Sequence, residues 1–332
     1  MTDLMWRVAK HEGVGNVVLE QIPIPEPGPG QVLVRTQVSL ISRGSELWRR
    51  YEMERAVSPD AMGYSTTGVI ARVGEGVTDY RPGDRVVASA PHAEYSLLSV
   101  QDREHPRVYP LDPGLSFEEG TFHPLATSSA GWTQAAQITP RDRVVVLGQG
   151  IVGNLVAQFA RRYRPAQLIA VDTLDLRCRL AEEVGTAAVV NASREDPVEA
   201  VKRLTGGAGA SIVIDCVGGR AGIDSFVQAQ KMLSSGGLIQ VVGKYQNAPL
   251  PLDVDSFQGK RVLASYPPDT DRAAMGRAAM AALAASQSPV GKPLVQVRRL
   301  ITHRFAGGEA KQAFDLLYQH PDQAMGVLFT WA

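Results

Sequence analysis

The fold is decided by residues 144–153, which read VVVLGQGIVG. Four apolar residues with strand character run into the pattern G-x-G-x-x-G, and a helical pattern follows. In this setting Gly148 makes a tight turn, Gly150 lets a pyrophosphate approach the backbone, and Gly153 lets the helix pack closely on the strand. The stretch therefore predicts a dinucleotide-binding βα turn. The alternative is a plain glycine-rich turn in some other α/β protein.

The residues around this turn predict how the dinucleotide is held. The helix amino terminus, at Ile151 and Val152, would present free N–H groups and positive dipole to the pyrophosphate. Asp172 ends the next apolar run 24 positions after Gly148, near the spacing of about 20 at which a carboxylate binds ribose hydroxyls. That carboxylate would repel a 2′-phosphate, so NAD(H) is favoured over NADP(H). Arg177 could swing toward such a phosphate, although a solvated helix charge is the simpler interpretation.

Beyond residue 131 apolar runs of four to six residues alternate with helical segments, which is the pattern of βαβ units around a parallel sheet. The expected strands lie at residues 143–147, 168–172, 187–191, 211–215, 238–243 and 261–265. Six such strands predict a doubly wound α/β fold, with ligands across the carboxyl ends of the strands. The residues expected at those ends, along the path of the cofactor, are Cys216, Val217, Val242 and Gly243. Cys216 itself is interpreted as a small buried apolar residue, since nothing near it in sequence would lower its pKa.

The rest of the chain has a different texture. From about residue 31 to 95, short β-rich runs alternate with Pro-Gly turns, which predicts a compact β domain. After residue 271 the pattern predicts a helix, a strand at 294–300, a helix at 308–318 and a final strand at 326–331.

The composition restricts the classes of function. The 34 Lys and Arg residues balance 34 Asp and Glu residues, so no excess charge would attract nucleic acid or an anionic membrane, and a small-molecule ligand is expected. No apolar run approaches the roughly 18 residues of a membrane span, and the first residues do not resemble a signal peptide. The two cysteines, Cys178 and Cys216, exclude a disulfide framework and a cysteine-clustered zinc lobe, so a reducing cytoplasm is expected.

Several short stretches occur in an order that resembles the medium-chain dehydrogenase/reductase superfamily, the alcohol-dehydrogenase-like proteins. They are PGPGQVLV at 27–34, GVIARVGEGV at 68–77, PGDRV at 82–86, AEY at 93–95, DCVG at 215–218 and HRF at 303–305. The resemblance implies a GroES-like β-rich catalytic domain at 1–122, a Rossmann NAD(P)-binding domain at 123–266, and a C-terminal segment at 267–332 that returns to the catalytic domain. It also implies an active-site cleft between the domains and a homodimer or homotetramer.

The sequence departs from this family at the positions of the zinc ligands. Ser42 stands in the place of a cysteine, Gly-Tyr-Ser at 63–65 in the place of Gly-His-Glu, and His-Pro-Leu at 123–125 in the place of a Cys or Glu-Pro-Leu segment. One histidine and two hydroxyls do not supply the three strong ligands of a catalytic zinc site, so no metal is predicted. The chain is most similar to the zinc-less, bacteriochlorophyllide dehydrogenase-like branch, which implies oxidation of a secondary alcohol to a ketone.

Without zinc, other groups must move the hydroxyl proton and stabilise the developing alkoxide. The resemblance puts His123, Tyr64 and Ser42 at the vacated positions, with Ser45 and Glu46 close in sequence. His123 is the candidate general acid/base and Tyr64 the candidate hydrogen-bond donor to the substrate oxygen. The alternatives are that His123 fills the space of the old ligand, that Tyr64 only packs, that Glu46 caps a helix, and that Ser42 bonds its own loop.

Two further roles are implied by position in the family alone: Thr127 would touch the nicotinamide, and Arg43 would lie near the pyrophosphate. Five histidines lack ligand spacing and are interpreted as surface or structural residues; they are His11, His92, His105, His303 and His320.

These observations together predict a zinc-independent oxidoreductase that transfers a hydride between NAD(H) and a secondary alcohol or ketone. One alternative is an enone or quinone reductase, against which Asp172 counts because such members more often favour NADPH. The other alternative is a catalytically idle dinucleotide-binding protein that acts as a sensor or scaffold.

Overall fold

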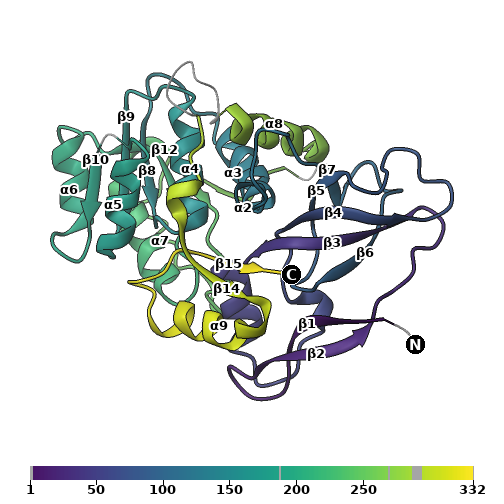
Figure 1. Ribbon diagram of the computed structural model, residues 1–332. Coiled ribbons are helices and arrows are strands. Elements are labelled where there is room, and N and C mark those ends of the chain that lie inside the picture. Colours follow the sequence, from purple (N-terminus) through teal and green to yellow (C-terminus); the bar gives the residue numbers. More distant parts are fainter. Residues whose placement is uncertain (1–2, 187, 268–269, 286–293, 332) are drawn as a thin grey trace. The chain divides into compact units, whose positions relative to one another are not determined.

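The computed structural model describes residues 3–186, 188–267, 270–285 and 294–331 (Figure 1). Contacts between Cα atoms divide the chain into two compact units. Unit 1 comprises Met1–Thr127, Asp271–Pro293 and Val297–Ala332, and unit 2 comprises Ser128–Thr270 and Leu294–Gln296.

Unit 2 contains a six-stranded parallel sheet in the order β10-β9-β8-β11-β12-β13 (Figure 1). The strands are β8 (Arg143–Leu147), β9 (Gln167–Asp172), β10 (Ala188–Asn191), β11 (Ala210–Asp215), β12 (Leu233–Val241) and β13 (Arg261–Ala264). Numbered within the sheet this order is 3-2-1-4-5-6, that of a dinucleotide-binding fold. The predicted doubly wound α/β fold is confirmed. β12 begins five residues before its predicted start, and Ala187, the predicted first residue of the third strand, lies outside the described residues.

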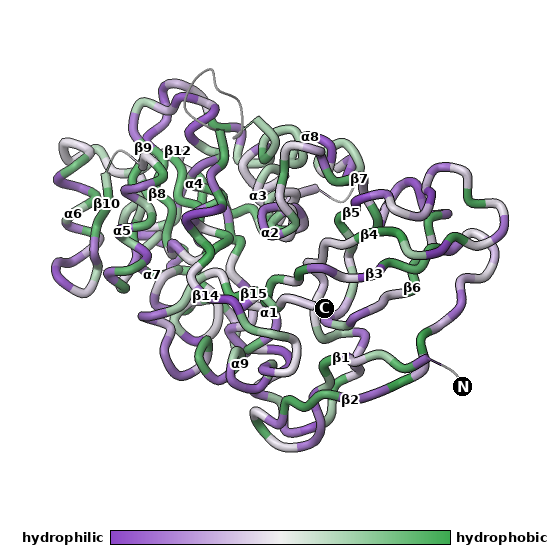
Figure 2. The backbone as a smooth tube through the Cα atoms, in the orientation of Figure 1, coloured by the Kyte–Doolittle hydropathy of each residue, from purple (hydrophilic) through white to green (hydrophobic). Residues whose placement is uncertain are grey.

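Alternation along the strands places side chains on two faces of this sheet, and each face has its own core. On one face Val145 and Leu147 of β8 pack with Phe226 and Val198 from the helices. On the other face, Val144 and its alternate neighbours pack against the helix that follows the glycine turn. Such near-continuous apolar strands are typical of a parallel sheet that is covered on both sides, and the strands β8 and β9 are green in Figure 2.

Unit 1 is built mainly from β-strands. A two-stranded sheet joins β1 (Leu4–Lys10) to β2 (Val17–Pro23). A larger, seven-stranded sheet has the order β14-β15-β3-β4-β5-β7, with β6 also paired to β3. Its strands are β3 (Gln31–Leu40), β4 (Thr66–Val73), β5 (Arg85–Ala88), β6 (Tyr95–Ser99), β7 (Val108–Pro110), β14 (Ile301–Ala306) and β15 (Gly326–Thr330). Because β15 pairs antiparallel with β3, a strand from the C-terminal part of the chain joins the sheet formed by β3 to β7.

The α-helices of the described residues are α1 (Arg43–Glu46), α2 (Phe117–Gly120), α3 (His123–Ala135), α4 (Ile151–Arg161), α5 (Asp175–Glu183), α6 (Pro197–Leu204), α7 (Ala221–Met232), α8 (Arg272–Ala284) and α9 (Ala310–Gln319). A π-helical turn, Leu47–Tyr51, continues α1. Within the described parts of the chain, no helix combines the length and the apolar character needed to cross a membrane.

One predicted element near the C-terminus is wrong. The strand expected at 294–300 is absent: Arg298–Leu300 form a 3-10 turn, and the strand begins at Ile301. The alternation of Val295 and Val297 suggested a strand, and both side chains are indeed buried. The segment that carries these two valines has no regular structure, however. The alternation therefore indicates which side chains are buried but does not indicate a strand.

Candidate functional site

The glycine-rich turn of unit 2 leaves space in front of a helix. Gly148 has a φ of 80°, and a Cβ there would lie 2.9 Å from Val217 Cγ2. A Cβ at Gly153 would collide with the carbonyl oxygen of Gly148. Gly150 differs, because a Cβ there would meet nothing within 4 Å. Gly150 is also the N-cap of α4 and no side chain caps that helix. The open space before the free N–H groups at Ile151 and Val152 fits a phosphate group.

Asp172, at the end of β9, is tied to this turn. Its Oδ2 accepts a 2.6 Å hydrogen bond from the Gln149 backbone N–H, and its Oδ1 accepts one of 3.0 Å from Leu174 N–H. The guanidinium of Arg177 lies 3.5 Å from Asp172 Oδ2. Asp172 therefore links the phosphate-binding turn to the start of α5, and Oδ1, with one donor, keeps a lone pair for a ribose hydroxyl. Arg177 is held as the partner of this carboxylate.

The ends of β11 and β12 are joined through Asp215. Its backbone carbonyl accepts from the N–H groups of Val242 and Gly243, and its carboxylate accepts from Val217 N–H at 3.1 Å. Burial raises the pKa of Asp215 to about 6, against the effect of hydrogen bonds from Ser225 and Val217. The predicted cofactor-lining residues Val217, Val242 and Gly243 are thus brought together at the carboxyl edge of the sheet.

Cys216 follows Asp215 at this edge. Its backbone N–H donates to Leu147 O at 2.9 Å, which connects β11 to β8. Burial, and then the charge of Asp215, raise the pKa of the Cys216 thiol well above its usual range. The thiol therefore stays protonated at neutral pH, which does not favour a role as nucleophile. The residue is partly exposed, whereas the sequence predicted a buried one.

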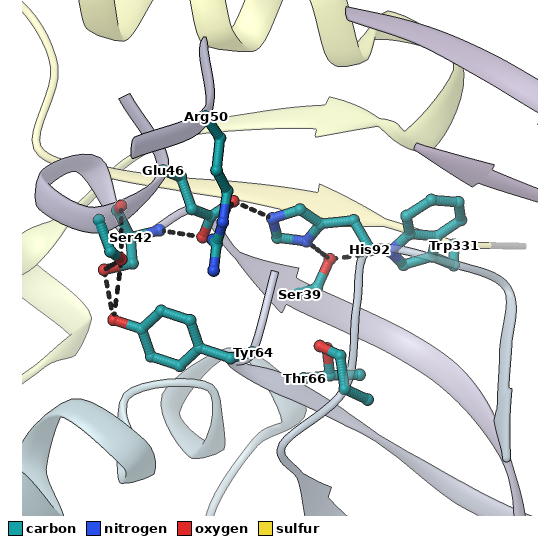
Figure 3. Close-up of polar contacts among 10 residues, drawn as sticks. Ser39, Ser42, Glu46, Arg50, Tyr64, Thr66, His92 and Trp331 are labelled. Atoms are coloured by element: carbon teal, nitrogen blue, oxygen red, sulfur yellow. Dashed lines mark hydrogen bonds and ion pairs between the residues drawn. The ribbon is translucent and has the colours of Figure 1, made fainter. Parts of the chain in front are cut away.

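In unit 1, three hydroxyl groups meet at the start of α1 (Figure 3). The Tyr64 hydroxyl donates to Ser42 Oγ at 2.5 Å, and Ser45 Oγ donates to Ser42 Oγ at 3.0 Å. Ser45 Oγ also lies 3.4 Å from the Tyr64 hydroxyl. Ser42 is buried, whereas Ser45 and Tyr64 are partly exposed. We call these three residues the hydroxyl cluster; two of them stand at positions that the family resemblance gives to metal ligands.

A buried polar network lies directly behind the hydroxyl cluster (Figure 3). Glu46 Oε1 accepts from the Ser42 backbone N–H at 2.8 Å, and Glu46 Oε2 lies 2.9 Å from His92 Nε2. His92 Nδ1 is 2.8 Å from Ser39 Oγ, which accepts from the Trp331 indole N–H at 3.0 Å. Sequence reasoning missed His92. It lies 46 positions from Glu46 and no local spacing joins the two residues, so only the fold reveals the contact.

The donor chemistry of this region does not fit zinc. Ser42 and Tyr64 contribute neutral hydroxyls that are hydrogen-bonded to each other, and the Glu46 carboxylate is engaged with Ser42 N–H and His92. Throughout the described ranges, no group of three or more His, Cys, Asp or Glu side chains is placed to hold a metal ion. Zinc sites are built from thiolate, imidazole and carboxylate ligands, which the hydroxyl cluster lacks.

His123, the first residue of α3, makes its contacts with residues outside the hydroxyl cluster. Its Nε2 bonds the carbonyl oxygen of Gly276 in α8 at 2.8 Å, and its ring packs 4.7 Å from that of Tyr109. The side chain is only 2% exposed. Burial lowers the pKa of His123 to about 4, although the bond to Gly276 opposes this shift. The ring is therefore neutral at pH 7, which favours the packing alternative over the acid/base role.

Two residues with roles implied by the family make structural contacts in unit 1. The Thr127 hydroxyl donates to His123 O within α3 at 2.8 Å. Arg43 Nε donates to Leu317 O in α9 at 3.1 Å. These bonds fix both side chains locally.

Comparison with known proteins identifies two domains that follow one another in the sequence. Residues 28–139 match the alcohol dehydrogenase GroES-like domain family, and residues 152–284 match the zinc-binding dehydrogenase family. Human sorbitol dehydrogenase is 26% identical over 341 residues, which cover 91% of this chain and 90% of that protein.

Solved structures match along nearly the whole chain. A short chain alcohol dehydrogenase (rspB) of Escherichia coli CFT073, complexed with NADH, has a TM-score of 0.82 at 20% identity, covering 98% of this chain and 99% of that one. A protein of Sinorhizobium meliloti 1021, bound to NADP, has a TM-score of 0.81 at 24% identity, covering 99% of each chain. At these identities the likeness shows the shared fold.

Proposed function

The chain belongs to the medium-chain dehydrogenase/reductase superfamily of NAD(P)-dependent oxidoreductases, and we propose that it is a zinc-independent member that transfers a hydride between NAD(H) and a secondary alcohol or ketone. One observation carries the proposal: hydroxyl groups of Ser42, Ser45 and Tyr64 are hydrogen-bonded together where the family resemblance puts metal ligands. Such a cluster can bind and polarise a substrate oxygen without a metal.

The proposed chemistry assigns a role to each hydroxyl. Bound nicotinamide supplies the hydride acceptor for oxidation and the hydride donor for reduction. In the resting protein the Tyr64 O–H donates to Ser42 Oγ. When a ketone binds, this O–H turns to donate to the carbonyl oxygen and stabilises the negative charge that develops on it. Ser42 and Ser45 hold the phenol and pass a proton between substrate oxygen and solvent, because each hydroxyl can accept one hydrogen bond while donating another. In the oxidation direction the same hydroxyls accept the alcohol proton.

NAD(H) is the proposed cofactor, with Asp172 as the selecting residue. Its buried carboxylate accepts from the Gln149 N–H of the glycine turn, so a 2′-phosphate placed there would meet a negatively charged group. Arg177 is already paired with that carboxylate, which supports the view that it does not serve a phosphate. The rest of the proposed cofactor set consists of Gly148, Gly150, Ile151, Val152, Gly153, Thr127, Arg43, Cys216, Val217, Val242 and Gly243.

An enone or quinone reductase is the second candidate, since such an enzyme also needs a donor to a carbonyl oxygen. A panel of secondary alcohols, sugars, cyclitols and the matching ketones, followed at the absorbance of NADH, separates the candidates. Reduction at a carbonyl carbon with a preference for NADH is the expected result. Turnover confined to conjugated enones or quinones, or a clear preference for NADPH, would contradict the proposal. Absence of any turnover despite NADH binding would favour the idle-scaffold alternative.

We also propose that the protein is a homodimer or a homotetramer. The last strand of the parallel sheet, β13, pairs only with β12 among the described strands, and Val262 on it is 44% exposed. Nearby in sequence, Leu252 and Val254 are 48% and 66% exposed. An apolar sheet edge is normally covered by another element or a second copy. Light scattering that returns the single-chain mass of 35.7 kDa would contradict this proposal.

A further inference from the structure

A carboxylate and an imidazole are buried together in unit 1. The side chains of Glu46 and His92 are each 0% exposed, with 2.9 Å between Glu46 Oε2 and His92 Nε2. The His92 ring also lies edge-on to Phe329, with 5.0 Å between the ring centroids. Removing two such groups from water is unfavourable, and an apolar pair of similar size would often be as stable. A role other than stability is therefore worth seeking in what the pair holds.

On one side of the pair, Glu46 makes a bond that leaves the Ser42 hydroxyl available to Tyr64 and Ser45. Ser42 is the N-cap of α1, a position where a serine hydroxyl usually accepts a bond from the helix backbone. Here the Ser42 side chain makes no capping bond. The Glu46 side chain folds back to accept the Ser42 backbone N–H, and Ser42 Oγ instead receives bonds from Tyr64 and Ser45. Glu46 thus fixes the backbone of Ser42 while leaving its hydroxyl to the cluster.

On the other side of the pair, His92 contacts the segment that precedes Tyr64. The His92 backbone N–H donates to Met62 O at 2.6 Å. Gly63, between Met62 and Tyr64, has a φ of 107°, and a Cβ on it would lie 2.7 Å from His92 N. The residue before the phenol therefore packs directly on the His92 backbone. His92 is thus connected to Ser42 through Glu46 and to Tyr64 through the neighbouring Gly63.

The hydrogen bonds of the network have a consistent direction. Trp331 donates to Ser39 Oγ, which leaves the Ser39 hydroxyl hydrogen for His92 Nδ1. His92 Nε2–H then donates to Glu46, whose other oxygen accepts from Ser42 N–H. Arg50 Nη1, 3.9 Å from Glu46 Oε2, balances the carboxylate charge. In this arrangement both oxygens of Glu46 have partners, which holds the carboxylate in a single orientation.

We propose that His92 and Glu46 are positioning residues, which hold Ser42 and Tyr64 in the geometry that polarises the substrate oxygen. The inference rests on the proposed function for its catalytic meaning, but the positioning itself is a property of the resting protein. Neither residue touches the substrate oxygen; each acts through the hydroxyl cluster.

The first test observes Tyr64 without any substrate. Tyrosines are labelled with ¹³C at Cζ, and the Tyr64 signal among the nine tyrosines is assigned by its loss in Tyr64→Phe. We expect His92→Phe, which has no donor for Glu46, to shift the Tyr64 signal, and His92→Gln, whose amide reaches a similar place, to shift it less. Tyr80→Phe is the matched control, because it removes a tyrosine hydroxyl bonded to Val108 O in the same unit but outside the network.

The outcomes of this test are decisive for positioning alone. A Tyr64 signal unchanged in His92→Phe, or moved as far by Tyr80→Phe, would overturn the inference. Should His92→Phe fail to fold, Glu46→Gln, which keeps the shape of the carboxylate, takes its place. An unchanged Tyr64 signal in Glu46→Gln would likewise overturn the inference. None of these results depends on catalysis. If the wild-type protein turned over no substrate, the proposed function would be contradicted, but this test of positioning would still apply.

The second test uses the ketone that the wild-type protein reduces fastest. In His92→Phe we expect kcat to fall roughly tenfold to a hundredfold, as misplaced catalytic groups do, with KM and the NADH dissociation constant within about twofold. With NADH deuterated at the transferred position, the isotope effect on kcat should rise, because the chemical step becomes slower. An unchanged kcat, or an equal loss in Tyr80→Phe, would reduce His92 to a structural residue.

Discussion

Three hydroxyl groups at the start of α1 form the chemical centre of the proposed mechanism. Hydroxyls differ from metal ligands in that each can both donate and accept, so the bonds among Ser42, Ser45 and Tyr64 can rearrange to give a substrate oxygen a donor. Phenol is the strongest acid of the three groups. Tyr64 should therefore carry most of the stabilisation of a developing alkoxide, and its removal should affect the transition state more than the ground state.

Replacing Tyr64 by phenylalanine tests this role. We expect kcat of Tyr64→Phe to fall roughly a hundredfold, the usual effect of losing one donor to an oxyanion, while NADH binding is unchanged. Steady-state kinetics and NADH fluorescence titration measure the two effects. Tyr51→Phe is a suitable control, since it removes a hydroxyl bonded to Asp315 at 2.7 Å in the same unit. Equal kcat values for Tyr64→Phe and wild type would exclude Tyr64 from the chemistry.

Asp172 is predicted to set the preference between the two nicotinamide cofactors. Asp172→Asn retains an oxygen for the Gln149 N–H but removes the charge that would repel a 2′-phosphate. We expect the ratio of the NADPH to the NADH dissociation constant to fall at least about tenfold, which corresponds to about 1.4 kcal/mol. Asp175→Asn removes a carboxylate that is 68% exposed, three positions further along, and should leave the ratio unchanged. A ratio unaltered in Asp172→Asn would contradict the selecting role.

Residues differ in how far the sequence alone could define their roles. Asp172 was identified because its strand and the glycine turn are adjacent in the chain. Its tie to Gln149 follows from the local fold. His92 was interpreted as surface or structural because its partners Glu46 and Ser39 come from distant segments. His123 was assigned an acid/base role by position, whereas its burial and its bond to Gly276 depend on a helix 150 residues later.

At the scale of elements, the turn between β8 and α4 contains a glycine, Gly150, that the backbone conformation does not require but that a bound phosphate would. Gly150 has an ordinary φ of −60° and room for a Cβ, so Gly150→Ala should change the free energy of unfolding by less than about 0.5 kcal/mol. The added methyl group would occupy the space before the helix, and we expect the NADH dissociation constant to rise about tenfold or more. Chemical denaturation and fluorescence titration measure the two quantities.

The control for this variant is Gly308→Ala, which also has open space around its Cβ but lies in unit 1. It should alter neither quantity. If Gly150→Ala bound NADH as tightly as the wild type, the phosphate would not lie against this turn.

The contact between α3 and α8 should make stability depend on pH. The pKa of His123 is about 4 in the folded protein and 6.5 when unfolded. Between these values the unfolded chain binds a proton that the folded chain does not, so stability falls as pH is lowered. His123→Gln keeps a donor for Gly276 O and cannot titrate. The free energy of unfolding of wild type relative to this variant should therefore drop by about 2 kcal/mol between pH 7.5 and pH 5.

Urea unfolding of both proteins at the two pH values checks this expectation. The comparison is needed because Asp215 has the opposite effect: its folded pKa of about 6 lies above its unfolded value of 3.8. Its contribution to stability is present at low pH and is lost as pH rises toward 6. Asp215 is common to both proteins and cancels in the difference. A difference independent of pH would mean that the pKa of His123 is the same in the folded and the unfolded protein.

Elements with a strong local pattern were predicted well, and the failure was at a weak one. The parallel strands carry runs such as VVVL at 144–147 that specify burial on both faces. The segment at 294–300 offered only two valines in alternation. Contacts assign Leu294–Gln296 to unit 2, whereas Val297 onward belongs to unit 1. A stretch that passes from one unit to the other has no sheet partner along its whole length, so alternation there is a poor guide.

At the scale of the whole molecule, the two units divide the proposed labour. Unit 2 contributes the glycine turn, Asp172 and the strand ends for the dinucleotide, and unit 1 contributes the hydroxyl cluster and the network behind it. Balanced charge, 34 basic against 34 acidic residues, suits an enzyme that relies on short-range contacts for a small substrate. The framework is that of alcohol dehydrogenases, and the claim that separates this chain from its zinc-dependent relatives is that hydroxyls replace the metal.

The most direct measurement of that claim is the zinc content of the purified protein together with its turnover before and after chelation. We expect far less than one zinc per chain and a turnover of the preferred ketone or alcohol that chelation leaves unchanged. About one zinc per chain, with turnover lost on chelation and restored by added zinc, would contradict the account.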